Sequence, residues 1–115
     1  MVDGTGRQPT TDTNSFKLKT MLLLEIVSPE GHLFKGGVTS VTVPGTNGEF
    51  QMLNNHANIV SILTKGTIKI GVPDFNSNTE FSAKFEKSAQ EQKFLLPITS
   101  GTLELKDNRV IILVG

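Results

Sequence analysis

Apolar residues in this chain recur at every second position, in short runs that turn-forming residues interrupt. Side chains of a β-strand point alternately to its two faces, so a period of two predicts strands with one buried face. The clearest runs hold Leu22, Leu24 and Ile26; Val41 and Val43; Val60 and Ile62; and Ile68 and Ile70. Turn residues punctuate the chain at 29–31, 36–37, 44–45, 47–48, 65–66 and 74–78. Many short strands with regular turns are typical of a sandwich or a barrel.

The C-terminal stretch predicts a hairpin. Leu103 and Leu105 lead into the pair Asp107-Asn108, which tolerates the left-handed backbone angles of a tight turn. A second alternating run, Val110 to Val114, then returns. No window shows helical periodicity over three turns, and the best helix-forming stretch, 88–93, is too short to be stable alone. The chain is therefore expected to be all-β.

Composition excludes several classes of function. A chain of 115 residues is long enough for one domain, and its 11 basic and 11 acidic residues cancel, so no electrostatic footprint for nucleic acid or an anionic membrane is present. The chain has no cysteine, which excludes disulfides, thiol nucleophiles and Cys-based metal sites. The most apolar early run, 21–27, is too short to span a bilayer and contains Glu25. A partner is expected to be another protein.

Residues 1–20 have almost no apolar content and are predicted to be a disordered tail, either a natural extension or an expression leader. Residues 21–115 are predicted to form the β domain, as a sandwich or a barrel.

The side chains that could support catalysis or metal binding are few. His32 and His56 are the two histidines, 24 positions apart, which gives no ligand spacing for a metal. Ser61, His56 and Glu49 share a region, but no nucleophile motif accompanies them, so an enzyme is the weakest hypothesis. The glycines at 45 and 48 lack the Gly-Lys-Ser/Thr of a phosphate-binding loop and are interpreted as turn glycines. No cofactor is expected.

The chain has seven phenylalanines and neither tryptophan nor tyrosine. An alternative hypothesis is a free-standing, OB-like ligand-binding module that uses Phe50 with Phe81, Phe85 and Phe94 as contacts. Such platforms need a positive groove, which this chain lacks, so the last three are more simply core or sheet-face residues.

The segment from Pro44 to Val60 is interpreted as a docking loop. Phe50, Met52 and Leu53 stand there among polar, turn-forming residues, an arrangement typical of an interface. The competing interpretation is that these three side chains close the end of the sandwich core. The residues alone leave the two balanced.

A series of landmarks runs in order along the chain. The landmarks are Val27-Ser28, Gly31, Phe34, Gly36 or Gly37, Gly48-Glu49, His56-Ala57, and Gly66 with Ile68 and Ile70; the series resumes at 100–105 and 108–113. This series closely resembles the epsilon subunit of bacterial F-type ATP synthases. The resemblance implies a flattened β-sandwich of about ten strands in two antiparallel sheets.

The resemblance also implies a function without catalysis. In that family the sandwich lies at the foot of the central stalk, binds the gamma subunit and the c-ring, and turns with the rotor. Contact with the alpha/beta hexamer is indirect, and attachment to the cytoplasmic face of the bacterial inner membrane is through the complex. The implied role is coupling of proton or sodium translocation to ATP synthesis.

By position in the motif, Glu49, Phe50, Asn54, Asn55 and His56 are expected at the surface facing the c-ring and the gamma foot. Ser28 and Ser61 are weaker candidates for the gamma side.

The chain departs from the family in three places. The usual proline after His-Ala is Asn58, which is expected to loosen the local backbone and add a donor. The span 71–98 is longer than usual, and its parts 80–87 and 91–97 are predicted to form an extended hairpin. The inhibitory C-terminal helical hairpin of the family is expected to be absent.

Overall fold

The computed structural model describes residues 21–77, 81 and 84–115. The predicted tail, residues 1–20, lies outside the described residues. Ten strands and one short 3₁₀ helix follow in order: β1 Leu22–Ser28, β2 Gly31–Val38, β3 Ser40–Gly45, β4 Gly48–Leu53, β5 Ile59–Leu63, β6 Gly66–Gly71, η1 Phe75–Ser77, β7 Glu86–Ser88, β8 Lys93–Ile98, β9 Gly101–Lys106 and β10 Arg109–Val114. Among the described residues no helix is long and apolar enough to cross a membrane.

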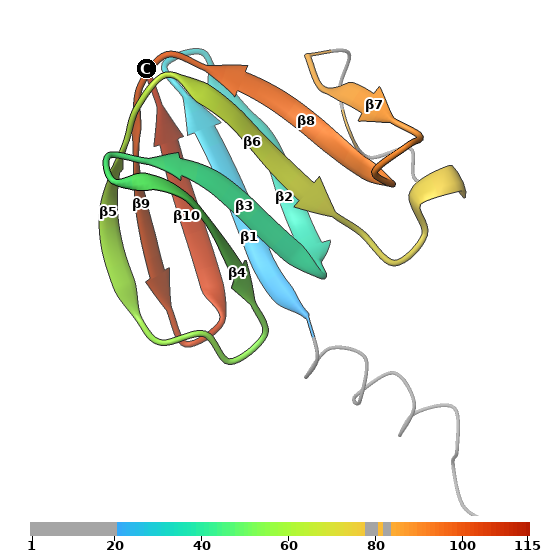
Figure 1. Cartoon of the computed structure of the whole chain (residues 1–115), viewed down its shortest axis with the longest axis horizontal. Helices are drawn as coiled ribbons and strands as arrows, with labels where there is room; N and C mark the ends of the chain where they lie inside the picture. Colours follow the sequence, from blue (N-terminus) through green and yellow to red (C-terminus); the bar gives the residue numbers. More distant parts are fainter. Residues whose placement is uncertain (1–20, 78–80, 82–83) are drawn as a thin grey trace, which may run out of the picture.

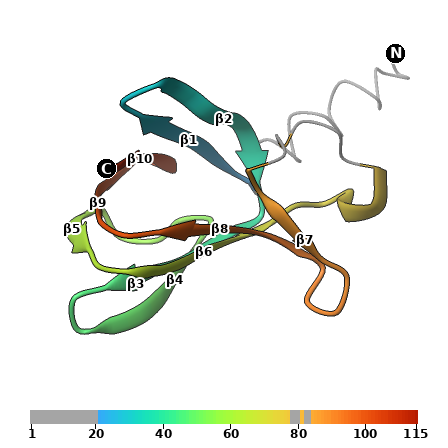
Figure 2. The same ribbon diagram turned by 90° about the horizontal axis from the view of Figure 1, so that it is seen from above.

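The strands form one continuous sheet that curls into two facing layers (Figures 1 and 2). Its order is β2-β1-β10-β9-β5-β3-β6-β8-β7, with β4 also paired to β3. The joint between the layers is narrow, because β5 and β3 pair only at Gly45 and Leu63. The predicted sandwich is confirmed, with two differences in detail. Its two layers are parts of one sheet instead of two separate sheets, and one strand pair is parallel. Strands β1 and β10 are parallel, whereas the other pairings between described strands are antiparallel.

Alternate residues of the central strands fill the space between the layers. The predicted inward sets of β1, β3, β6, β9 and β10 are buried: Leu22, Leu24, Ile26, Val41, Val43, Ile68, Ile70, Leu103, Leu105, Val110 and Ile112. Burying one aliphatic side chain contributes about 1.5–3 kcal/mol, so this interlayer core is the main source of stability.

The predicted C-terminal hairpin is confirmed. Asp107 and Asn108 have φ values of 51° and 64°, and positive φ at both central residues is the condition for a type I′ turn, whose twist matches that of the flanking strands. The backbone N–H of Leu23 also donates to the carbonyl of Asn108 at 2.9 Å. The turn is therefore fixed to the start of β1.

The expectation that 44–60 is a loop is wrong for most of that segment, whereas its docking role stays a prediction. Residues 48–53 are β4, paired along its length with β3. Met52 is 0% exposed and belongs to the core, Phe50 is half-buried against it, and Leu53 is 51% exposed. Phe50 and Met52 are two positions apart and both turn inward, so they obey the same period of two as the other strands. Within 44–60 only the turn 46–47 and the loop 54–58 lie outside the strands.

One further expectation needs correction. Gly36 and Gly37, expected in a turn, lie within β2, opposite Leu24 and Leu23. The hairpin predicted for 80–87 and 91–97 is present in its described part, where β7 pairs with three residues of β8. Residues 80, 82 and 83 lie outside the described residues.

Phenylalanine rings fill the end of the sandwich beside this hairpin. Phe81 stacks on Phe34 with ring centroids 4.3 Å apart and on Phe94 at 4.0 Å. Phe85 meets the Phe81 ring edge-on at 4.9 Å. Phe85 and Phe94 are buried in the core, so these rings are engaged with one another and form no open stacking platform. The prediction that they are core residues is confirmed for Phe85 and Phe94, and Phe81 is partly buried against the core.

Candidate docking surfaces

The outer face of the layer β2-β1-β10-β9-β5 carries large apolar side chains that nothing in the described part of the fold covers. The exposed residues on it are Leu23, Val60, Ile62, Ile111 and Leu113. Val60 and Ile62 are 76% and 65% exposed. Isolated exposed apolar residues are ordinary, whereas several on one sheet face mark a binding surface. We call these five residues the apolar face.

Strand register brings the apolar face together from distant parts of the sequence. Ile111 pairs with Glu104, which pairs with Val60. One step along the strands, Leu113 pairs with Thr102, which pairs with Ile62. Side chains of directly opposed residues lie about 4.5–5.5 Å apart at Cβ. The two rows therefore lie side by side on one face across three strands, with Glu104 and Thr102 between their apolar members.

Charged side chains border this patch and separate its members. Glu25 of β1 pairs with Ile111 of β10. The Glu25 carboxylate lies 2.8 Å from Nδ1 of His32 on β2. Leu23, Ile111 and Arg109 line a shallow hollow of about 180 Å³ beside Gly36. A surface with apolar anchors, interspersed charges and a hollow has the composition of a protein–protein interface.

The amino-acid sequence also indicates the apolar face, because some strands are apolar at consecutive positions and not only at every second one. The runs 22–24, 59–60 and 110–114 are apolar at both alternating positions. A strand that is apolar on both sides is one that is covered on both sides. The described fold covers only one side of β10, so the other side is open to a partner.

The loop after β4 holds three of the predicted interface residues together. Asn54 and His56 are half-buried and Asn55 is exposed. Nδ1 of His56 lies 2.8 Å from the carbonyl oxygen of Ala57. Asn58 does not loosen this loop as predicted: its Oδ1 accepts a hydrogen bond of 2.9 Å from the N–H of Asp107, which ties the loop to the β9–β10 turn.

Glu49 lies at the other end of β4, next to the β3–β4 turn. About 13 Å of extended strand separates it from Leu53, which precedes the loop. Its carboxylate is half exposed and faces Nζ of Lys69 at 3.8 Å, and Lys69 also lies 3.9 Å from Glu91. Glu49 and the 54–56 loop therefore form two separate polar regions, where a single surface was expected.

Ser61 and Ser28 lie apart from the apolar face. Ser61 is on β5 between Val60 and Ile62, so its side chain is on the opposite side of the strand, and its hydroxyl contacts the carbonyl of Ile62 at 3.3 Å. Glu49 lies at the far end of β4, where it faces Lys69. Nδ1 of His56 faces the carbonyl of Ala57. Ser61, His56 and Glu49 are therefore not assembled as a catalytic triad.

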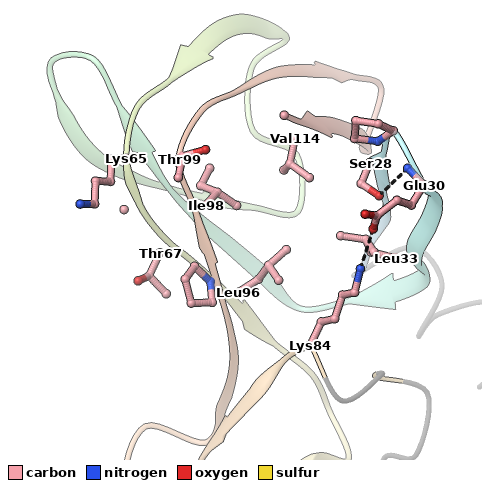
Figure 3. Close-up of a pocket in the computed structure, with 14 residues that line it drawn as sticks. Ser28, Glu30, Leu33, Lys65, Thr67, Lys84, Leu96, Ile98, Thr99 and Val114 are labelled. Carbon is pink, nitrogen blue, oxygen red and sulfur yellow. Dashed lines mark hydrogen bonds and ion pairs between the residues drawn. The ribbon is translucent and has the colours of Figure 1, made fainter.

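Ser28 lines a cavity of about 610 Å³ at the open end of the sandwich (Figure 3). Its hydroxyl donates to the carbonyl of Gly31 at 3.2 Å and accepts from the N–H of Glu30 at 3.2 Å, which closes the β1–β2 turn. Apolar side chains of both layers point into this cavity, and Lys84 bonds Glu30 at 2.9 Å on its rim. The cavity walls contain Leu33, Leu96, Ile98 and Val114.

Within the described parts of the chain, no group of three or more His, Asp or Glu side chains is placed to hold a metal ion.

The comparison with known families agrees with this geometry. The family model described as "ATP synthase, Delta/Epsilon chain, beta-sandwich domain" matches residues 21–115. The chain belongs to this delta/epsilon family. The match covers every described strand of the curled sheet.

Curated relatives of this delta/epsilon chain are similar over part of their length. The chain is 55% identical over 53 residues to the ATP synthase epsilon chain of a Nitratiruptor species, which covers 46% of this chain and 41% of the relative. It is 44% identical over 63 residues to the epsilon chain of Wolinella succinogenes, a match that covers 55% of this chain and 47% of the relative. The matched regions span less than half the length of these relatives.

Solved structures share the fold of this delta/epsilon domain. A chain in the Euglena gracilis mitochondrial ATP synthase structure, which contains OSCP, F1 and the c-ring, matches with a TM-score of 0.65 and 18% identity, over 83% of this chain and 51% of that one. A chain in the Tetrahymena thermophila mitochondrial ATP synthase structure of the central stalk and c-ring matches with a TM-score of 0.59 and 17% identity. This match covers 84% of this chain and 63% of that one.

Proposed function

We propose that this chain is the β-sandwich part of an epsilon subunit, a non-catalytic rotor component of an F-type ATP synthase. In this role it joins the gamma subunit to the c-ring, so that ion flow through the membrane part drives ATP synthesis in the alpha/beta hexamer. Its place is the cytoplasmic face of the bacterial inner membrane, where the rest of the complex holds it. Family membership supports this proposal, and the unpartnered apolar face is the observation that carries it.

The apolar face is the surface that we assign to gamma. A rotor contact has to transmit torque without slipping, which favours several buried anchors over one flexible patch. The apolar face offers five large side chains on paired strands, where the sheet fixes their spacing. Glu25, Glu104 and Arg109 around them add charge-assisted contacts that set the orientation.

The two polar regions then carry the contacts with the c-ring and the gamma foot. Glu49 presents a half-exposed carboxylate beside the β3–β4 turn, and the 54–58 loop presents amides and the His56 ring. Polar groups at the rim of an interface give specificity and register more than affinity.

The experiment that tests this function measures binding to the cognate gamma subunit. The chain and gamma, mixed at micromolar concentration, are expected to co-elute from a sizing column. The double variant Val60→Asp, Ile111→Asp is expected to weaken binding by at least about a hundredfold, because each carboxylate loses its hydration in the contact.

The matched control is Asn76→Asp, which introduces the same carboxylate at an exposed residue of η1, outside the apolar face and the two polar regions. This variant is expected to co-elute like the wild type. Failure of the wild-type chain to bind gamma would overturn the proposed function, and equal binding by the double variant would overturn the assignment of the apolar face.

A further inference from the structure

Asparagine side chains bind the β4–β5 loop to the β9–β10 turn. Oδ1 of Asn108 accepts from the N–H of Asn55 at 2.7 Å, and its Nδ2 donates to Oδ1 of Asn54 at 2.9 Å and of Asn55 at 3.4 Å. Oδ1 of Asn58 accepts from the N–H of Asp107 at 2.9 Å. The loop and the turn lie side by side at one end of the molecule (Figure 1). We call residues 54–58 and 107–108 together the amide tip.

These bonds fix the orientation of each amide. A backbone N–H can only donate, so the atoms of Asn108 and Asn58 that face Asn55 and Asp107 must be their oxygens. Nδ2 of Asn108 then faces Oδ1 of Asn54 and Asn55. Each of these side-chain oxygens accepts one hydrogen bond within the amide tip. The NH₂ groups of Asn55 and Asn58, two donors each, are on exposed residues and can donate to a partner.

The backbone of the amide tip is also held in unusual angles. Asn55 has a φ of 67°, in the left-handed region that asparagine tolerates better than most residues. The N–H of His56 donates to the carbonyl of Leu53 at 3.1 Å. Because Asn108 is also bonded to β1 through its carbonyl, the loop is anchored to the body of the sandwich.

We infer that Asn58 and Asn108 are positioning residues that hold the 54–58 loop ready for docking, and that the amide tip binds an acceptor-rich segment of the rotor. Such a segment presents backbone carbonyls or carboxylates to the amide donors. This inference rests on the proposed function, since it concerns one of the polar regions assigned to the rotor contact. Ordering a loop before binding removes an entropic cost from the binding step, so the hydrogen bonds of the amide tip raise affinity.

The test measures binding of the full chain to a rotor assembled from cognate gamma and c-ring without epsilon. Asn108→Gly keeps positive φ accessible and produces Asp-Gly, a favoured type I′ turn, but removes three side-chain bonds. We expect binding about tenfold weaker, with faster amide hydrogen exchange at Asn55.

A second variant separates positioning from contact. Asn58→Asp keeps an oxygen for the N–H of Asp107 but replaces the NH₂ donor with a carboxylate oxygen. Exchange at Asp107 is expected to stay slow while binding falls about tenfold or more, because two acceptors then face each other. Asn76→Ala, at an exposed asparagine of η1, is the control and is expected to bind like the wild type.

The outcomes distinguish the two proposals. If the wild-type chain binds the rotor and both amide-tip variants bind equally well, the inference is overturned while the proposed function stands. If the wild-type chain does not bind the rotor, the proposed function itself is overturned.

Discussion

Ile62 and Leu113 lie in one cross-strand row of the apolar face, one on each side of Thr102. They are 65% and 51% exposed, so neither contributes much to folding. The double variant Ile62→Thr, Leu113→Thr is expected to change the free energy of unfolding by about 0.5 kcal/mol or less, since threonine suits a strand. Urea denaturation checks this, and gamma binding by the same variant is expected to fall. A large loss of stability would mean that these side chains serve the fold instead.

Ile111 and Ile112 provide a matched pair on β10. Ile112 is fully buried between the layers, and Ile111 is 42% exposed on the apolar face. We expect Ile112→Ala to reduce the free energy of unfolding by about 2–5 kcal/mol, through lost burial and the cavity left behind. Ile111→Ala is expected to cost about 1 kcal/mol or less. Denaturant titrations of both variants measure the difference, and equal costs would contradict the assignment of the two faces.

The parts of the fold that the sequence predicts well are those with local causes. Alternation places Leu22, Leu24 and Ile26 inward without reference to any other strand. The Asp107-Asn108 turn is fixed by the backbone angles that these two residues accept. The strand β4 is hard to distinguish from a loop because only Phe50 and Met52 mark its inner side, and turn-forming residues flank it.

The binding surfaces are harder to predict because they depend on register between distant strands. Val60 and Ile111 are neighbours only through Glu104. Asn54 and Asn108 are 54 positions apart, and no local pattern indicates that they bond. The resemblance assigns Glu49 and His56 to one surface. In the structure most of β4 separates them, which the order of residues in a motif does not show.

Phe81 is the central ring of the aromatic stack, with Phe34 on one side and Phe94 on the other. Phe81→Ala is expected to destabilise the fold by about 2–3 kcal/mol, from two stacked pairs and partial burial. Phe81→Leu keeps most of the apolar volume and loses the ring geometry, so the free energy of unfolding is expected to fall by about 1 kcal/mol. Thermal unfolding of the two variants separates these contributions. An unchanged unfolding temperature in both variants would show that the stack does not stabilise the fold.

Glu30 and Lys84 link the β1–β2 turn to the segment before β7 across 54 positions. The hydrogen bond from Lys84, 2.9 Å long, and its positive charge hold the pKa of Glu30 below its ordinary value of 4.5. A lowered carboxyl pKa stabilises the folded state above the unfolded-state pKa, and this contribution disappears as pH falls through the lower folded-state pKa. The pH range in which the stabilising contribution of this pair is lost therefore lies below pH 4.5. The effect on stability is small because both side chains are exposed.

The variant Lys84→Met tests this link. In it the pKa of Glu30, followed by carboxyl NMR titration, is expected to rise towards 4.5, because both the hydrogen bond and the positive charge are removed. Lys87→Met, which removes a neighbouring lysine, serves as the control and is expected to leave the pKa of Glu30 low. A Glu30 pKa that is unchanged in Lys84→Met would show that another group lowers it.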